Sequence, residues 1–129
     1  MRWHQPLAAL LGIGIVAAGV DALQDAAESR HDPRPPGTVI ELVVDASIHR
    51  SERGQTLAER VEAKILSCRL EVRSDLAEPI RSGHDGRFVA RLTPSMDASN
   101  RRQFRGCLED WTIEHVKMDV VRLAEVAPR

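Results

Sequence analysis

Residues 101–111 read RRQFRGCLEDW, and the fold that the sequence predicts is built around this stretch. Its apolar residues recur at i, i+3, i+4 and i+7, the spacing of one face of an amphipathic helix: Phe104, Cys107, Leu108 and Trp111. A helical face of this kind is stable only when it packs against other apolar residues. We therefore expect a helix over 101–111 whose apolar face lies against the core of the domain.

The opposite side of this predicted helix is charged and carries Arg101, Arg102, Arg105, Glu109 and Asp110. Three arginines on one face could bind an anion such as a lipid headgroup or an acidic polymer. The commoner explanation is a solvated face, braced by an i, i+4 pair between Arg105 and Glu109. Glu109 and Asp110 oppose the helix dipole in a last turn, so we expect arginines from the strands or the first helix to compensate them. The five residues are kept as a candidate anion or partner surface.

Two elements are predicted upstream of this helix. Residues 38–46, TVIELVVDA, are rich in β-branched residues and alternate apolar with polar, which predicts a first strand. Thr56 and Glu59 form a capping box, which predicts the start of a first helix running to about Cys68. Because Cys68 lies on the apolar stripe of that helix, we expect it to face inward, towards Cys107.

A hairpin is predicted between the two helices. Residues 78–82 and 87–93 are short extended runs on either side of a glycine-rich turn, in which Asp85-Gly86 is the strongest turn signal. Pro79 cannot donate a hydrogen bond to a neighbouring strand, so the first arm belongs at a sheet edge.

The last predicted strand covers residues 115–126, where the alternation shifts at Val121 and predicts a β-bulge. The order strand, helix, strand, strand, helix, strand, with right-handed crossovers, gives an α+β, ferredoxin-like sandwich over residues 38–129. Its two helices cover one face of a four-stranded antiparallel sheet in the spatial order 4-1-3-2. The other face is expected to be a solvated ionic surface with Glu41, Asp45, Arg87, Arg91, His115 and Lys117.

Residues 1–23 read as a signal anchor or a signal peptide. Arg2 precedes an apolar run and Asp21 comes after it, an order that directs the C-terminal side out of the cytoplasm. The apolar run, residues 7–20, is shorter than the roughly 20 residues of a comfortable membrane helix, so cleavage is an alternative, as is a buried apolar helix. We expect residues 7–23 to contact the membrane as an N-terminal hydrophobic helix, and the domain to lie outside the cytoplasm or, after cleavage, to be secreted. Residues 24–37 are a polar, proline-rich linker.

Cys68 and Cys107 are the only cysteines. An exported domain would join them in a disulfide, which closes a loop of about 40 residues and stabilises by about 4 kcal/mol in the chain-entropy model. The alternative is two buried free thiols that act as small apolar side chains. The spacing is not that of a redox motif, so disulfide-exchange catalysis is not expected.

Composition narrows the possible ligands. The chain has 18 basic and 19 acidic residues, and its aromatic residues after Trp3 are Phe88, Phe104 and Trp111, each expected on a core face. With no basic excess and no exposed ring, we expect no nucleic-acid partner. None of the five histidines pairs at metal-binding spacing with another His, Asp or Glu on one element, and phosphate-loop or dinucleotide motifs are not seen, so we expect no metal and no cofactor.

The segment RRQFRGCLEDW, the upstream Cys68 and the downstream VKMDVV resemble a set of short actinobacterial proteins that share a basic pair, a GCLED-like core and an upstream cysteine. The likeness extends over residues 56–121 and is most specific in the second helix. It implies an exported or membrane-tethered small domain and implies no catalytic activity. Trp111 and Ile113 depart from the small polar residues common at those positions.

The sequence thus predicts a non-catalytic interaction or accessory module of the cell envelope, which docks or dimerises through a sheet edge or the open sheet face. The alternative is a small envelope hydrolase or transferase that uses Glu109, Asp110 and His115 for acid and base chemistry.

Overall fold

The computed structural model describes residues 32–48 and 54–129. The predicted anchor or signal helix, and the predicted linker before residue 32, lie outside these residues. Within the described ranges, none of the helices has the length and apolar character that a membrane crossing requires.

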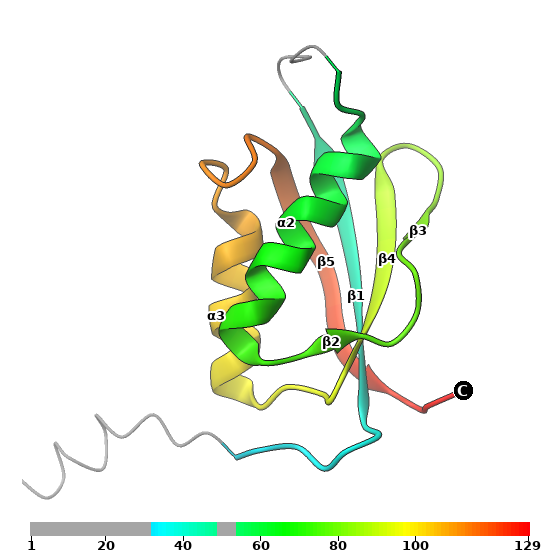
Figure 1. Ribbon diagram of the computed structural model, residues 1–129, viewed down its shortest axis with the longest axis vertical. Helices are drawn as coiled ribbons and strands as arrows, with labels where there is room; N and C mark the ends of the chain where they lie inside the picture. Colours follow the sequence, from blue (N-terminus) through cyan, green and yellow to red (C-terminus); the bar gives the residue numbers. More distant parts are fainter. Residues whose placement is uncertain (1–31, 49–53) are drawn as a thin grey trace, which may run out of the picture. The chain divides into compact units, whose positions relative to one another are not determined.

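Two helices lie on one face of an antiparallel sheet, so the domain is an α+β fold, as the sequence predicted (Figure 1). The described elements, in chain order, are β1 (Val39–Ser47), α2 (Leu57–Val72), β2 (Asp75–Leu76), β3 (Arg81–Ser82), β4 (Arg87–Thr93), α3 (Ala98–Glu109) and β5 (Lys117–Val126). Strands pair in the order β2-β4-β1-β5, and β3 also pairs with β4. The described sheet therefore has five strands, with β2 and β3 in the place of the single second strand that was expected.

The first arm of the predicted hairpin is divided because of its proline. Asp75 and Leu76 pair with the end of β4, and Arg81 and Ser82 pair with its beginning. Pro79 lies between these two short strands and has no N–H to offer to β4. The prediction of a continuous strand over 78–82 was wrong, whereas its place at the sheet edge is confirmed.

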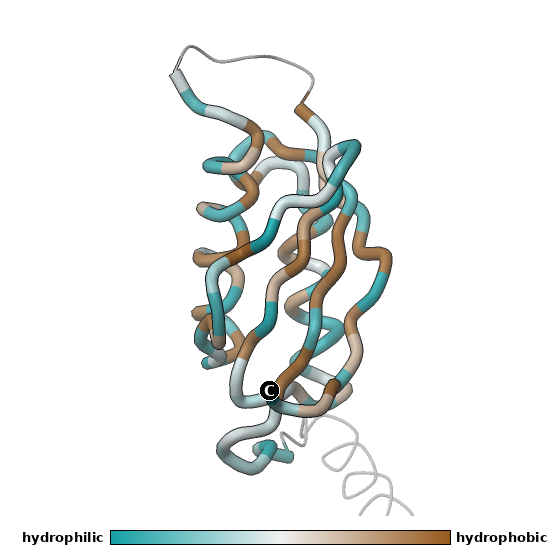
Figure 2. Tube along the Cα trace, turned by 90° about the vertical axis from the view of Figure 1, so that its right-hand side faces the viewer, coloured by the Kyte–Doolittle hydropathy of each residue, from teal (hydrophilic) through white to brown (hydrophobic). Residues whose placement is uncertain are grey.

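The core lies between the sheet and the two helices. Ile40, Leu42 and Val44 are buried on the helix side of β1, and Glu41 and Val43 between them face the other side. Figure 2 shows the same alternation as brown and teal segments along the strands. The helices contribute their own buried side chains, namely Val61, Ile65 and Cys68 from α2 and Phe104 and Leu108 from α3.

Helix α2 begins at the predicted capping box. The Thr56 hydroxyl accepts from the Glu59 N–H at 3.2 Å, and the Glu59 carboxylate accepts from the Thr56 N–H at 2.7 Å. The helix continues one turn past Cys68 and ends where Arg73 adopts a left-handed conformation with φ of 53°. The predicted end at Cys68 was therefore one turn short.

Strand β5 contains the predicted bulge. Val43 pairs with Arg122 and Val44 pairs with Val120, which leaves Val121 as the extra residue without a partner in β1. The extra residue shifts the alternation within β5. Val120 before the bulge and Leu123 after it therefore both pack on the core, opposite Val44 and Leu42 of β1.

The turn between β3 and β4 requires glycine at position 86. Asp85 and Gly86 both have positive φ, 60° and 77°, and the Gly86 carbonyl accepts from the Ala46 N–H at 2.8 Å. A Cβ at this position would lie 2.6 Å from the Ala46 carbonyl oxygen, which belongs to the neighbouring backbone. The turn is thus held against the end of β1 by an approach that only glycine permits.

We expect Gly86→Ala to lower the free energy of unfolding by about 1 to 3 kcal/mol, because it adds both left-handed strain and a backbone clash. The matched control is Gly106→Ala in α3, where a Cβ meets nothing within 4 Å. That change should raise the free energy of unfolding by about 1 kcal/mol through helix propensity. Urea unfolding of both variants measures the difference, and equal midpoints would contradict the tight approach at Gly86.

Candidate functional site

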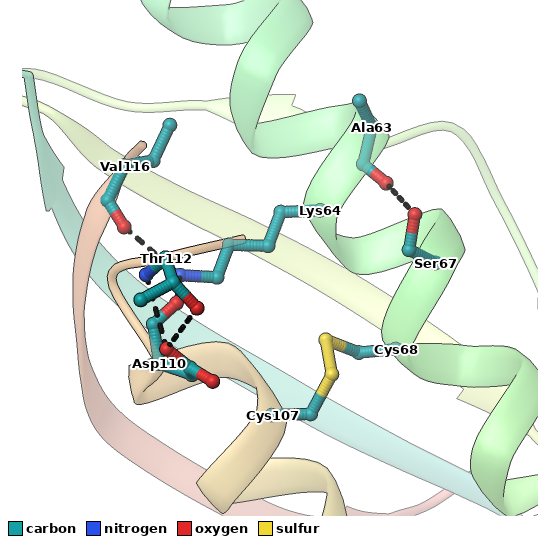
Figure 3. The surroundings of a disulfide bond; sticks show 8 residues. All are labelled: Ala63, Lys64, Ser67, Cys68, Cys107, Asp110, Thr112 and Val116. Atoms are coloured by element: carbon teal, nitrogen blue, oxygen red, sulfur yellow. Dashed lines mark hydrogen bonds between the residues drawn. A yellow bond between two sulfur atoms is a disulfide. The ribbon is translucent and has the colours of Figure 1, made fainter. Parts of the chain in front are cut away.

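Cys68 of α2 and Cys107 of α3 form a disulfide, as predicted (Figure 3). Their Cα atoms are 5.8 Å apart, and the bond joins residues separated by 39 positions. The Cys68 side chain is buried in the core, whereas Cys107 is partly exposed. The bond forms because the apolar stripes of the two helices face each other across the same part of the core.

A buried lysine lies next to the disulfide. Lys64 is one helical turn before Cys68 and is fully buried. Figure 3 shows its side chain reaching from α2 towards the end of α3, where its Nζ donates to the carbonyl oxygens of Asp110 at 2.6 Å and Val116 at 2.9 Å. Burial lowers the pKa of the Lys64 ammonium, and the nearby charge of Asp110 opposes that shift.

Lys64 is the cation that compensates the C-terminal end of α3. The sequence predicted compensation from the first helix or the strands and named arginines, and the structure places a lysine there instead. The sequence contains one indication of this role. Residues 61, 64, 65 and 68 share one side of α2, and Lys64 is the charged residue among them, so its side chain lies on the apolar side of the helix.

Asp110 ends α3 with its side chain. Its carboxylate accepts from the Thr112 backbone N–H at 3.0 Å and from the Thr112 hydroxyl at 2.7 Å. Asp110 itself has extended backbone angles and forms the C-cap. The two hydrogen bonds from Thr112, with the charge of Lys64, hold the pKa of the Asp110 carboxyl below its ordinary value.

The early end of α3 corrects two predictions. The helix spans Ala98–Glu109 and not residues 101–111, and Asp97 begins it by accepting from the Asn100 N–H at 2.7 Å. Trp111 therefore falls outside the helix, and its side chain is 65% exposed. The apolar stripe continues past the point at which the Asp110 turn ends the helix, so periodicity alone placed Trp111 in the core.

His115 lies in the loop before β5 and not in the strand, so it does not join the ionic face as predicted. Its ring contacts Trp111, with centroids 6.3 Å apart and planes at 47°. In the described residues, the Asp110 carboxylate bonds to Thr112 and the His115 ring contacts Trp111, and the side chains of Asp110 and His115 do not interact with each other. Two of the three residues assigned to acid and base chemistry, Asp110 and His115, therefore have other partners.

The arginines of the candidate anion surface do not act as one group. Arg101 is half-buried and its Nε donates to the Met96 carbonyl oxygen at 2.9 Å, which binds the start of α3 to the preceding loop. Arg102 and Arg105 are exposed. Arg105 and Glu109, both in the described part of α3, do not form the ion pair that their spacing suggested.

The open face of the sheet is ionic, as predicted. Arg91 of β4 lies 2.9 Å from Glu41 of β1, and Arg122 of β5 lies 3.7 Å from the same carboxylate. Arg87 and Asp45 form a second cross-strand pair at 2.8 Å, which lowers the pKa of the Asp45 carboxyl. These pairs lie across neighbouring strands and stabilise the sheet modestly.

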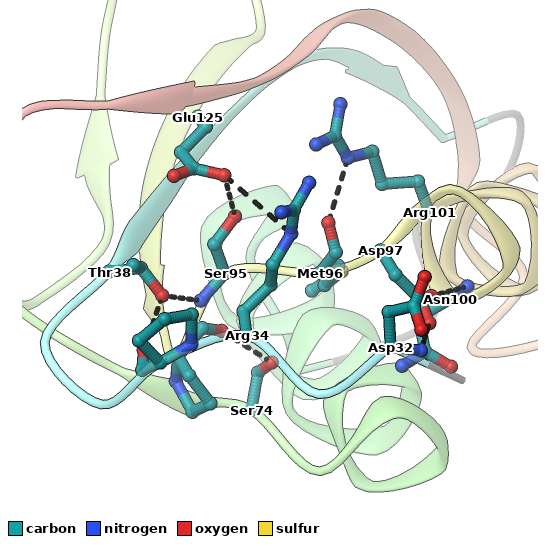
Figure 4. A network of polar contacts seen from close by, with 12 residues as sticks. Asp32, Arg34, Thr38, Ser74, Ser95, Met96, Asp97, Asn100, Arg101 and Glu125 are labelled. Atoms are coloured by element: carbon teal, nitrogen blue, oxygen red, sulfur yellow. Dashed lines mark hydrogen bonds and ion pairs between the residues drawn. The ribbon is translucent and has the colours of Figure 1, made fainter. Parts of the chain in front are cut away.

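Residues 32–37 contact the domain at the end of the sheet (Figure 4). The Asp32 N–H donates to the Asp97 carboxylate at 2.8 Å, and Arg34 lies 3.9 Å from Glu125. This last part of the predicted linker is therefore bound to the start of α3 and the end of β5.

A pocket of about 450 Å³ lies at the same end, between the linker and the two helices. Arg34 and Arg73 supply positive charge to its lining, and Glu71 supplies negative charge. Sequence reasoning missed this pocket because it exists only where the linker folds back on the domain.

No group of three or more His, Cys, Asp or Glu side chains within residues 32–48 and 54–129 is arranged to hold a metal ion. Comparisons with protein-family models, with curated proteins and with solved structures found no match to this chain.

We expect Lys64→Met to lower the free energy of unfolding by about 2 to 4 kcal/mol, because it removes the hydrogen bonds of the ammonium to the carbonyl oxygens of Asp110 and Val116, the second of which is buried. The matched control is Lys117→Met on the exposed side of β5, where a change within about 0.5 kcal/mol is expected. Urea unfolding of the oxidised proteins gives both values. A loss at Lys64 no larger than that at Lys117 would contradict the anchoring role of the ammonium.

We expect Asp110 to contribute stability that is lost in acid. Its pKa in the folded protein lies below the ordinary 3.8, so the unfolded chain binds a proton at this carboxyl before the folded protein does as the pH falls. The free energy of unfolding should therefore decrease from about pH 5 downward, until the pH passes the folded pKa. Asp110→Asn should remove this part of the decrease, which urea midpoints measured across acidic pH can show. An unchanged acid slope in the variant would refute it.

Proposed function

We propose that the chain is an exported or membrane-tethered protein of the cell envelope and that its domain is a non-catalytic interaction module. The observation that supports this most is the disulfide between Cys68 and Cys107. Structural disulfides persist in oxidising compartments and are rare in the cytoplasm. In a domain of about 100 residues, the bond contributes about 4 kcal/mol, a large share of the stability of a typical domain.

The N-terminal sequence supports the same location. Residues 1–23 carry the charge order of a segment that directs the downstream part of a chain out of the cytoplasm. If the N-terminal segment is retained, residues 7–23 bind the membrane. If the segment is removed, the domain is secreted. The resemblance to short exported actinobacterial proteins agrees with either outcome.

We also propose that the domain is ferredoxin-like. Two helices cover one face of an antiparallel sheet whose long strands are ordered β4-β1-β5, with β2 and β3 completing the edge. That order is the one expected for two split βαβ units. The fold itself names no activity.

Interaction is favoured over catalysis by the structural roles of Asp110, one of the candidate acid and base residues, and of its neighbour Lys64. The Asp110 carboxylate accepts two hydrogen bonds from Thr112 directly after α3, and the Lys64 ammonium donates to two carbonyl oxygens. These groups hold the fold together at the place where the alternative function would require proton transfer. The surface beside them carries an exposed aromatic residue, Trp111, which is a common component of binding interfaces.

The proposal is tested by the redox state and the location of the full-length chain in a bacterial host. Cells are lysed in the presence of a thiol-reactive polymer, and the membrane fraction is washed with alkaline carbonate. We expect the thiols to react only after reduction. We also expect the protein either to remain in the washed membranes or to be found outside the cytoplasm, shortened at its N-terminus.

The control is the Cys68→Ser, Cys107→Ser double variant, which should show the same location without a reduction-dependent change in mobility. Free thiols on a full-length protein in the cytoplasmic fraction would overturn the proposed location. A turnover that Glu109→Gln abolishes, in protein with an intact disulfide, would instead favour the hydrolase or transferase.

A further inference from the structure

The most unusual surface feature is the loop of residues 110–116, which we call the tryptophan loop. It joins α3 to β5 and presents Trp111, whose side chain is 65% exposed. A tryptophan is the largest apolar side chain, and a small domain gains most by burying it. This domain instead holds it in solvent.

The loop is held at both of its ends by the same lysine. The Lys64 Nζ donates to the carbonyl oxygens of Asp110 and Val116, at 2.6 Å and 2.9 Å, and Val116 is itself buried (Figure 3). Between these ends, the Ile113 N–H donates to the Asp110 carbonyl oxygen at 3.2 Å, and the Ile113 side chain packs on the core. The shape of the loop is thus set from inside the domain.

The backbone of the loop also has two residues in the left-handed conformation. Glu114 and His115 are consecutive residues with left-handed φ of 56° and 51°. Such a conformation costs about 1 kcal/mol or more for each residue that is not glycine, and it persists where the surroundings impose it. A loop fixed in this way loses little conformational entropy when a partner binds.

His115 contacts the indole from one direction, at a ring separation of 6.3 Å, and most of the remaining indole surface faces solvent. The charged residues next to Trp111 in the sequence are acidic: Glu109 and Asp110 precede it, and the exposed Glu114 comes three residues after it. Indole attracts cations to its face, and carboxylates beside it strengthen that preference. The chemistry around Trp111 therefore fits a positively charged side chain.

The tryptophan loop lies far from the point at which the described part of the chain begins. Figure 1 places it at the opposite end of the domain from residues 32–37, through which the chain arrives from its N-terminus.

We propose that the tryptophan loop is the docking site for a basic segment of a partner protein. An arginine or lysine side chain of that segment stacks on Trp111, and Glu109 and Glu114 balance its charge. This names the partner class for the proposed interaction module and so rests on the proposed function.

The test is binding of an acetylated hexa-arginine peptide to the full-length protein, solubilised in neutral detergent. In a Trp3→Phe background Trp111 is the only tryptophan, so its fluorescence reports contact with the indole. We expect the peptide to change this fluorescence, and the affinity to fall when the ionic strength rises from about 0.15 M to about 1 M. Hexa-glutamate should not bind.

Calorimetry of variants separates the indole from general charge attraction. Trp111→Ala should weaken hexa-arginine binding by about tenfold or more, and Glu109→Gln with Glu114→Gln should weaken it further. The matched control is Leu70→Ala, since Leu70 is also an exposed apolar residue, at 67%, but lies on α2. This control should bind as the parent does. A disulfide detected by mass spectrometry in each variant shows that the fold is kept.

Three results would overturn the inference: absent binding, binding unaffected by Trp111→Ala, and binding of the neutral glycan chitohexaose in preference to the peptide. The last would assign the loop to a glycan. If these failures occur while the thiols are oxidised and the protein lies outside the cytoplasm, the docking site is refuted and the proposed location stands.

Discussion

The attachment of α3 to α2 is the constraint on which the rest of this domain depends. A chain of this size buries a limited apolar core, so the second helix cannot rely on packing alone. Cys68 and Cys107 fix the distance between the helices covalently, and Lys64, one turn away, fixes where α3 ends and β5 begins. With both fixed, Phe104 and Leu108 are directed into the core and β5 enters the sheet beside β1.

A buried lysine would ordinarily destabilise a domain, because removing an ammonium from water is costly. Here the cost is offset by two carbonyl oxygens and by the negative end of the α3 dipole, to which Asp110 adds its charge. The carbonyl groups at the end of a helix need donors in any case. Lys64 supplies a donor to both carbonyl groups, which a buried aliphatic residue of the same size could not do.

Local rules predicted most of the fold from the sequence. The capping box at Thr56 depends on contacts between near neighbours in the sequence. The bulge at Val121 and the pairing of the two inward cysteines follow from the repeating pattern of apolar residues along a strand and two helices. Trp111 was misplaced because helical periodicity says where a stripe lies and does not say where the helix stops. The stop depends on Asp110 bonding to Thr112 and on Lys64, from 46 positions earlier, and the latter contact requires the tertiary structure.

The same contacts that complete the fold also create the exposed surface at this end. Once Asp110 ends α3, Trp111 cannot continue the buried stripe, and Ile113 takes its place against the core. The Trp111 indole is exposed to solvent on a loop whose two ends both accept hydrogen bonds from the buried Lys64 ammonium. Stability and surface presentation are therefore coupled through Lys64, so loosening the helix end would also release the loop that carries Trp111. A domain that needed only to be stable could have ended α3 without placing its largest apolar side chain in water.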